Sequence, residues 1–162
     1  MSELEVTRFF GLRFPAFDKD IHEQDLWTPN ERQSIVERIA ESLRARQHVL
    51  LCGEPGLGKS CILRAVRRVL PEAKYPMTYI HNTTLGRHDF YRQLCTGLGL
   101  APKATAAALF HEVSTWVTQR GRDNLHPVFI IDEAQMLRDE VLGHLHVLAN
   151  YEWDQKPLLS LV

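Results

Sequence analysis

The stretch Gly53-Glu54-Pro55-Gly56-Leu57-Gly58-Lys59-Ser60 fits the pattern G-x-x-x-x-G-K-[ST], in which a glycine-rich loop cradles phosphate groups. It lies between an apolar run, His48–Cys52, and a segment from Cys61 to Leu70 with apolar residues at helical spacing. A strand, a loop and a helix are therefore predicted in that order. Glycines let the backbone turn its N–H groups inward, and the start of a helix adds partial positive charge. This region predicts a nucleotide-binding site.

Each polar residue of the loop has an expected role. Lys59 is expected to reach the β and γ phosphates and to assist catalysis. Ser60 is expected to offer its hydroxyl to Mg²⁺, which prefers hard oxygen ligands. A glycine-rich turn that merely caps a helix would need neither side chain. The residues expected to hold the nucleotide are Gly53, Glu54, Pro55, Gly56, Leu57, Gly58, Lys59, Ser60 and Cys61.

A second motif places two acids directly after an apolar strand. Val128–Ile131 is an uninterrupted apolar run, and Asp132 and Glu133 follow it. Ligands bind at the carboxyl ends of strands in open α/β sheets, so these acids are expected to face the nucleotide. Asp132 is predicted to anchor Mg²⁺ through its water shell, and Glu133 to be the general base that polarises the attacking water. Acids are also favoured as helix caps, but their occurrence together with the phosphate loop favours the catalytic interpretation.

The order of the expected elements indicates an α/β fold. Strands are predicted at His48–Cys52, Met77–His81, Val128–Ile131 and from residue 157 onward, with helices between them. This alternation predicts a three-layer P-loop NTPase with a parallel sheet, truncated in or after the fourth strand. The predicted helices cover 28–46, with a capping box formed by Thr28 and Glu31, and then 61–70, 87–98, 104–120 and 140–151. Residues 1–27 are expected to form an aromatic strap without a helix, and residues 28–162 the core domain.

Composition and charge exclude several classes of protein. The formal net charge of −1 does not favour general attraction to nucleic acid or membranes, although residues 61–124 alone carry 9 Lys/Arg and 4 Asp/Glu. That excess is typical either of a polyanion-facing surface or of solvated helix faces. The 3 cysteines have no metal-ligand spacing. An acidic amino terminus and the absence of an apolar run near 18 residues favour a cytoplasmic protein without a membrane-spanning segment.

The two motifs resemble those of a known family. Together with Ile131-Asp132-Glu133-Ala134-Gln135, the opening Phe10-Gly11-Leu12 with Pro15 and Phe17, and the closing 158–162, they resemble the ATP-binding helper proteins of bacterial transposons. These proteins are the ExeA/TniB-like branch of the AAA+ ATPases. The resemblance implies an ATPase that uses ATP and Mg²⁺, forms an ATP-dependent ring or filament, binds DNA without sequence preference and regulates a transposase.

The resemblance also implies roles for further residues. Asn82 would hold the catalytic glutamate inactive until a partner binds, Gln135 would approach the γ-phosphate, and the aromatic residues from Phe10 to Phe17 would close over adenine. Hydrolysis would be weak, because the sensor, the arginine and the helical lid that such proteins carry after the fourth strand are absent. The residues implied to contact DNA are Arg87, Arg92, Lys103, Arg120 and Arg122.

Two alternatives remain at the level of sequence. One keeps the nucleotide site but uses it as a switch for protein assembly, as in the secretion-associated ExeA proteins. The other is a small-molecule kinase of the P-loop type. The pair Asp132-Glu133 argues against the kinase, because a kinase uses its acceptor as the nucleophile and needs no water-activating carboxylate after the magnesium-binding one.

Overall fold

The computed structural model describes residues 3–15, 25–26, 28–81, 84–150 and 157–162. Within these residues a parallel sheet is formed by β1 (Met77–Ile80), β2 (Val128–Ile131) and β3 (Ser160–Leu161), in the order β1-β2-β3. Ile80 lies opposite Ile131, so β1 and β2 end at the same edge of the sheet. The residues that follow β2 are Asp132 and Glu133, and this register therefore positions both acids at the carboxyl edge.

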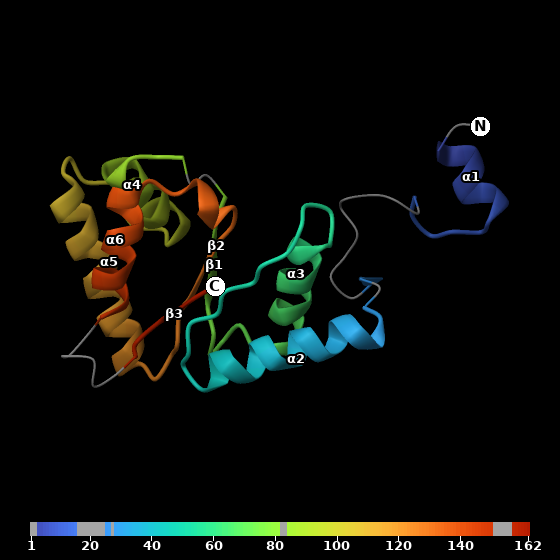
Figure 1. Cartoon of the computed structure of the whole chain (residues 1–162), viewed down its shortest axis with the longest axis horizontal. Helices are drawn as coiled ribbons and strands as arrows, with labels where there is room; N and C mark the ends of the chain where they lie inside the picture. The colour runs from blue at the N-terminus through green and yellow to red at the C-terminus, as the bar shows by residue number, and fades with distance from the viewer. Residues whose placement is uncertain (1–2, 16–24, 27, 82–83, 151–156) are drawn as a thin grey trace.

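Helices cover both faces of the sheet (Figure 1). On one face, α2 (Asn30–Arg44) and α3 (Lys59–Val69) share a core with Val128 and Ile130. On the other, α4 (Arg87–Gly97), α5 (Ala106–Arg122) and α6 (Asp139–Ala149) share a core with Phe129 and Ile131. Successive side chains of a strand point to opposite faces, so a strand between two helical layers must be apolar throughout. The predicted three-layer α/β fold with a parallel sheet is confirmed.

The predicted helices are present, but α2 begins differently from the prediction. Its inward side chains are Val36, Ile39, Ala40 and Leu43, all buried. The helix begins at Asn30 with Pro29 as its N-cap, and no side chain caps it. The Thr28 hydroxyl instead donates to the carbonyl of Leu26 at 3.1 Å. The capping box of Thr28 and Glu31 is therefore wrong, because the threonine is engaged with the chain that precedes it.

The segment His48–Cys52 does not form the buried strand that its apolar run predicts. The Val49 N–H donates to the Leu161 carbonyl at 2.9 Å, so the segment runs beside β3. Leu50, however, is 82% exposed, and no regular strand is assigned there. The partner strand is only two residues long, and the described parts of the chain offer no second neighbour. Pairing with a single two-residue strand gives the segment too few backbone hydrogen bonds to form a regular strand.

The amino-terminal region contains a helix where a strap was predicted. α1 (Glu3–Phe9) lies apart from the sheet in Figure 1. Arg8 in its last turn complements the helix dipole, a signal that the aromatic composition concealed. Phe9, Phe10 and Phe14 are exposed, whereas Phe17 lies outside the described residues. In the described ranges, no helix has both the length and the apolar character needed to cross a bilayer.

Candidate functional site

The phosphate loop ends in a backbone conformation that glycine allows. Gly56 (φ +86°) and Gly58 (φ +81°) both lie in the left-handed region, which side chains with a Cβ rarely adopt. Gly58 is the N-cap of α3, which begins at Lys59. A Cβ at Gly58 would lie 3.2 Å from Nη1 of Arg32, a residue of α2. The predicted transition from loop to helix is therefore present, and an arginine from the neighbouring helix lies against it.

Lys59 is held across the loop to which it belongs. Its Nζ donates to the carbonyl of Gly53 at 2.9 Å and to that of Glu54 at 3.2 Å. The two bonds place the ammonium charge over the concave side of the loop. A cation there is suited to an anionic ligand, because the first N–H groups of α3 add positive potential from the same side.

The two predicted motifs meet in one cavity. Gly53, Pro55 and Lys59 of the loop line a cavity of about 500 Å³ together with Asp132 and Glu133. Gln135 lines it as well. The volume is within the range of small-molecule pockets, which run from about 300 to 1,000 Å³. Residues of distant segments are thus brought to the same edge of the sheet, as the sequence predicted.

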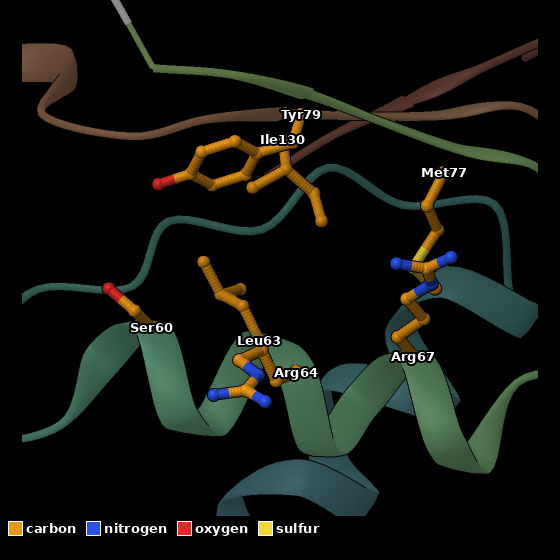
Figure 2. A pocket seen from close by; sticks show the side chains of 7 residues that line it. All are labelled: Ser60, Leu63, Arg64, Arg67, Met77, Tyr79 and Ile130. Atoms are coloured by element: carbon orange, nitrogen blue, oxygen red, sulfur yellow. The ribbon is translucent and has the colours of Figure 1, made fainter. Parts of the chain in front are cut away.

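Ser60 faces a neighbouring cavity of about 390 Å³ on the α3 side of the sheet (Figure 2). Leu63 and Ile130 form apolar walls of this cavity, and Tyr79 reaches into it from β1. In Figure 2 the Tyr79 hydroxyl points toward the end of the cavity where Ser60 lies. Ser60 and Asp132, the two residues predicted to serve Mg²⁺, therefore lie in adjoining spaces and not in one.

Asp132 is held by hydrogen bonds on both carboxylate oxygens. Its Oδ1 accepts from the Glu133 N–H at 2.9 Å, and its Oδ2 accepts from the Tyr79 hydroxyl. Its own N–H donates to the Ile80 carbonyl at 3.0 Å, which continues the pairing of β1 and β2 by one residue. Burial, the bond to Asp132 and the charges of Asp132 and Glu133 raise the pKa of Tyr79 to about 12. The tyrosine is therefore a protonated donor at any ordinary pH.

Glu133 occupies a strained backbone position. Its φ of +53° is left-handed, and it is the N-cap of the 3₁₀ helix η2 (Ala134–Met136). Strained residues other than glycine cluster at functional sites, where the surrounding structure holds them in place. The Gln135 amide donates to the Glu133 carboxylate. Gln135 was predicted to approach the γ-phosphate. It lines the same cavity as Lys59, and in this structure it engages Glu133. Asn82, which the resemblance implied would hold Glu133 inactive, lies outside the described residues.

The chemistry of the side chains suits magnesium. Ser60 and Asp132 offer oxygen donors, which are the ligands that Mg²⁺ prefers. Among the described residues no group of three or more His, Cys, Asp or Glu is arranged to hold a metal alone. A magnesium ion bound there would take its remaining ligands from phosphate oxygens and water, as is usual for this ion in nucleotide sites.

Comparison with known proteins places these motifs in a family. Residues 38–162 match the AAA domain family. The chain belongs to this family. It is also similar to general secretion pathway protein A of Aeromonas hydrophila, with 30% identity over 159 residues, which is 96% of the chain and 29% of that protein. A putative lon protease homolog of Methanothermobacter thermautotrophicus is 34% identical over 65 residues, covering 40% of the chain and 13% of that protein. The AAA domain thus spans less than a third of either relative.

These findings refine the resemblance drawn from sequence. The AAA assignment is confirmed, and so is a distant relationship to the ExeA-type secretion protein. The similarity to transposon helpers stays a prediction.

The AAA domain does not gather the predicted DNA contacts on one surface. Arg87 begins α4 at the carboxyl edge of the sheet, where its backbone N–H donates to Glu140 at 3.3 Å. Arg120 and Arg122 end α5 beside Gly121, where an added Cβ would meet Leu158, which precedes β3 at the opposite edge of the sheet. Three of the basic side chains form ion pairs: Arg92 with Asp89 at 3.2 Å, Lys103 with Glu112 at 3.3 Å, and Arg120 with Asp123 at 3.7 Å.

Two residues near the site were not predicted from sequence. Tyr79 was assigned only to a strand, and Arg32 only to a helix. The role of Tyr79 depends on the register that pairs it with Ile130 and on the end of β1 at the acidic edge. The position of Arg32 beside Gly58 depends on how α2 crosses the start of α3. Neither relation leaves a local signal in the sequence, although alternation along Met77–Ile80 does indicate that Tyr79 shares a face with Met77.

Proposed function

We propose that this AAA domain binds ATP with Mg²⁺ and hydrolyses it. The observation that carries the proposal is the single cavity lined by Lys59 of the phosphate loop and by Asp132 and Glu133 after β2. A glycine loop alone supports phosphate binding only. The acidic pair at the same cavity supports hydrolysis, because water attack on a γ-phosphate needs a carboxylate close to the water.

Each residue has a distinct task in this proposal. The loop amides and Lys59 bind the phosphates, and Ser60 and Asp132 hold the metal with its water shell. A magnesium ion held there would supply positive charge to offset the charge that develops on the phosphate oxygens. Glu133 takes the proton of the attacking water. In the resting site the Gln135 amide occupies that carboxylate, so Gln135 must release Glu133, or share it with the water, before hydrolysis.

The proposal is tested by nucleotide binding to Lys59→Ala. Removal of the ammonium leaves the loop without its only cation, and we expect the affinity for a fluorescent ATP analogue to fall by at least tenfold. The matched control is Lys103→Ala, which removes a lysine paired with Glu112 away from the cavity. Equal affinity of the wild type and the Lys59 variant would refute the site.

The biological use that we favour is a nucleotide-dependent switch for protein assembly, related to secretion. Support comes from the similarity to general secretion pathway protein A, which extends over 96% of the chain. A switch requires that assembly depend on the bound nucleotide. We therefore expect the mass measured by light scattering to rise with ATP and not with ADP, and to stay high in Glu133→Gln. A mass independent of nucleotide would contradict this use.

A second use, as a DNA-binding helper of a transposase, is favoured by the excess of basic residues in 61–124. Binding through phosphates would be steep in salt and independent of sequence. The test is DNA binding by the chain with ATP, with ADP and with neither. Replacing Arg87 and Arg92 together should then weaken binding and flatten its salt dependence. DNA binding without any change in these variants would place the contacts elsewhere, and no binding under any condition would remove this use.

A further inference from the structure

We infer that Tyr79 is a positioning residue for the magnesium site, acting through Asp132. The geometry that carries this inference is the bond from the Tyr79 hydroxyl to Asp132 Oδ2, together with the place of the same ring in the cavity that Ser60 lines. Tyr79 therefore lines the cavity of Ser60 and is bonded to Asp132, which lines the adjoining cavity. The inference rests on the proposed function, because it assigns a role within that site.

The position of Tyr79 differs from that of a core tyrosine. Its side chain is 48% exposed, so burial of the ring does not explain why a tyrosine stands there. The register sets it opposite Ile130, on the face of the sheet that α3 covers. Its ring also stacks on that of His81, with centroids 6.3 Å apart. Strand pairing and stacking fix the direction of the ring, and the hydroxyl at its end donates to the Asp132 carboxylate. Figure 2 shows the same hydroxyl at the end of the cavity where Ser60 lies.

The bond has a mechanical consequence for Asp132. A carboxylate after a strand can rotate about its Cα–Cβ and Cβ–Cγ bonds, and each rotation moves the oxygen that faces the metal. The Glu133 N–H holds Oδ1, and Tyr79 holds Oδ2. Only the second of these donors is a side chain. Outer partners that orient a metal ligand typically contribute about 10- to 100-fold to metal affinity or activity.

The test is a magnesium titration of ATP binding by Tyr79→Phe, which keeps the ring and removes the donor. We expect the Mg²⁺ concentration for half-maximal enhancement of affinity to rise about tenfold. Affinity for the fluorescent ATP analogue in excess chelator should equal that of the wild type, because the loop is intact. The control is Tyr75→Phe, the same change at a tyrosine buried in the α2 and α3 core. Tyr79→His, too short to reach Asp132, serves as a second variant should the phenylalanine variant fail to fold.

A double-mutant cycle separates positioning from a merely structural role. If Tyr79 acts through Asp132, then Tyr79→Phe should change nothing further in an Asp132→Asn background. A wild-type magnesium response in both Tyr79 variants, a lower magnesium requirement, or additive losses in the cycle would each overturn the inference. Failure of the wild type to bind ATP would instead refute the proposed function, so the two failures are distinguishable.

Discussion

The reactive side chains of the candidate site are engaged by neighbours in the same chain. Lys59 is bound by the carbonyls of Gly53 and Glu54, Asp132 by Tyr79, and Glu133 by Gln135. Each bond fixes a flexible side chain before a ligand arrives, which lowers the entropy lost on binding. The bonds differ in whether an arriving ligand must displace the partner. A phosphate can join the ammonium without displacing its partners entirely, whereas a water can reach Glu133 only if the Gln135 amide gives way.

Replacement of Glu133 by glutamine should separate binding from hydrolysis. Glutamine keeps the shape of the side chain but is no base, so we expect ATP turnover to fall by about 10²- to 10⁴-fold while nucleotide affinity is unchanged. Phosphate release under saturating MgATP measures the turnover, and titration with the fluorescent ATP analogue measures the affinity. Asp139→Asn, at an exposed position of α6, is the matched control for removing one negative charge. Persistent turnover in the Glu133 variant would assign the base to another residue.

At the scale of single elements, the start of α3 is the most constrained join in the site. Gly58 must be left-handed for the loop to turn back over Lys59, and Arg32 lies against it from α2. α6 contains a glycine in the opposite situation. Gly143 is in a helix interior, its φ is not positive, and a Cβ added there meets nothing within 4 Å. Replacement of glycine by alanine is therefore expected to lower the free energy of unfolding at position 58 and to raise it at position 143.

Gly58→Ala should destabilise the fold by about 1 to 2 kcal/mol, the cost of a left-handed residue with a Cβ, and should weaken ATP binding as the loop shifts. Gly143→Ala should stabilise it by about 0.5 to 1 kcal/mol, because glycine loses more backbone freedom in a helix than alanine. Urea denaturation of both variants measures these free energies of unfolding. A Gly58 variant as stable as the wild type, with intact ATP affinity, would show that the loop does not need this conformation.

The elements show which parts of the structure the sequence could predict. Periodicity predicts α2, α3 and β2 well, because their apolar residues face cores that any arrangement of these elements would create. Periodicity fails for His48–Cys52, because an apolar segment forms a regular strand only where neighbouring strands pair with it. The capping box predicted at Thr28 is also wrong, because its hydroxyl donates to the Leu26 carbonyl and does not cap α2. Motif spacing predicts the loop and the acids, but the contact between Tyr79 and Asp132 arises from pairing across strands.

On the scale of the whole molecule, His126 connects parts of the chain at the amino edge of the sheet. Its backbone N–H donates to the Lys74 carbonyl before β1, its ring packs edge-on against Tyr75, and its Nε2 pairs with the Ser160 hydroxyl of β3. It is 2% exposed and directly precedes the residues that enter β2. One histidine, through its backbone and its ring, thus joins the entry points of β1, β2 and β3, at the end of the sheet opposite the acids.

This arrangement makes stability depend on pH. Burial, with the charge of Arg46 and then of His48, lowers the pKa of His126 to about 4 from its ordinary value of 6.5. The unfolded chain therefore binds a proton at this residue that the folded chain excludes, once the pH falls below about 6.5. The free energy of unfolding is highest above that pH and declines toward pH 4, by at most about 1.4 kcal/mol per pH unit for this one group. Burial also lowers the pKa of His48 and His144, which adds to the decline.

His126→Gln should flatten this dependence. Glutamine is uncharged at every pH and keeps a polar group for Ser160, so the variant should lose stability at pH 7 but lose less of it between pH 6.5 and 5 than the wild type does. Urea midpoints measured at pH 7.5, 6.5, 5.5 and 5.0 give the two slopes. The control is His146→Gln, at an exposed position of α6, which should retain the wild-type slope. Parallel curves for the wild type and the His126 variant would mean that other groups carry the acid sensitivity and that the folded chain admits a proton at His126.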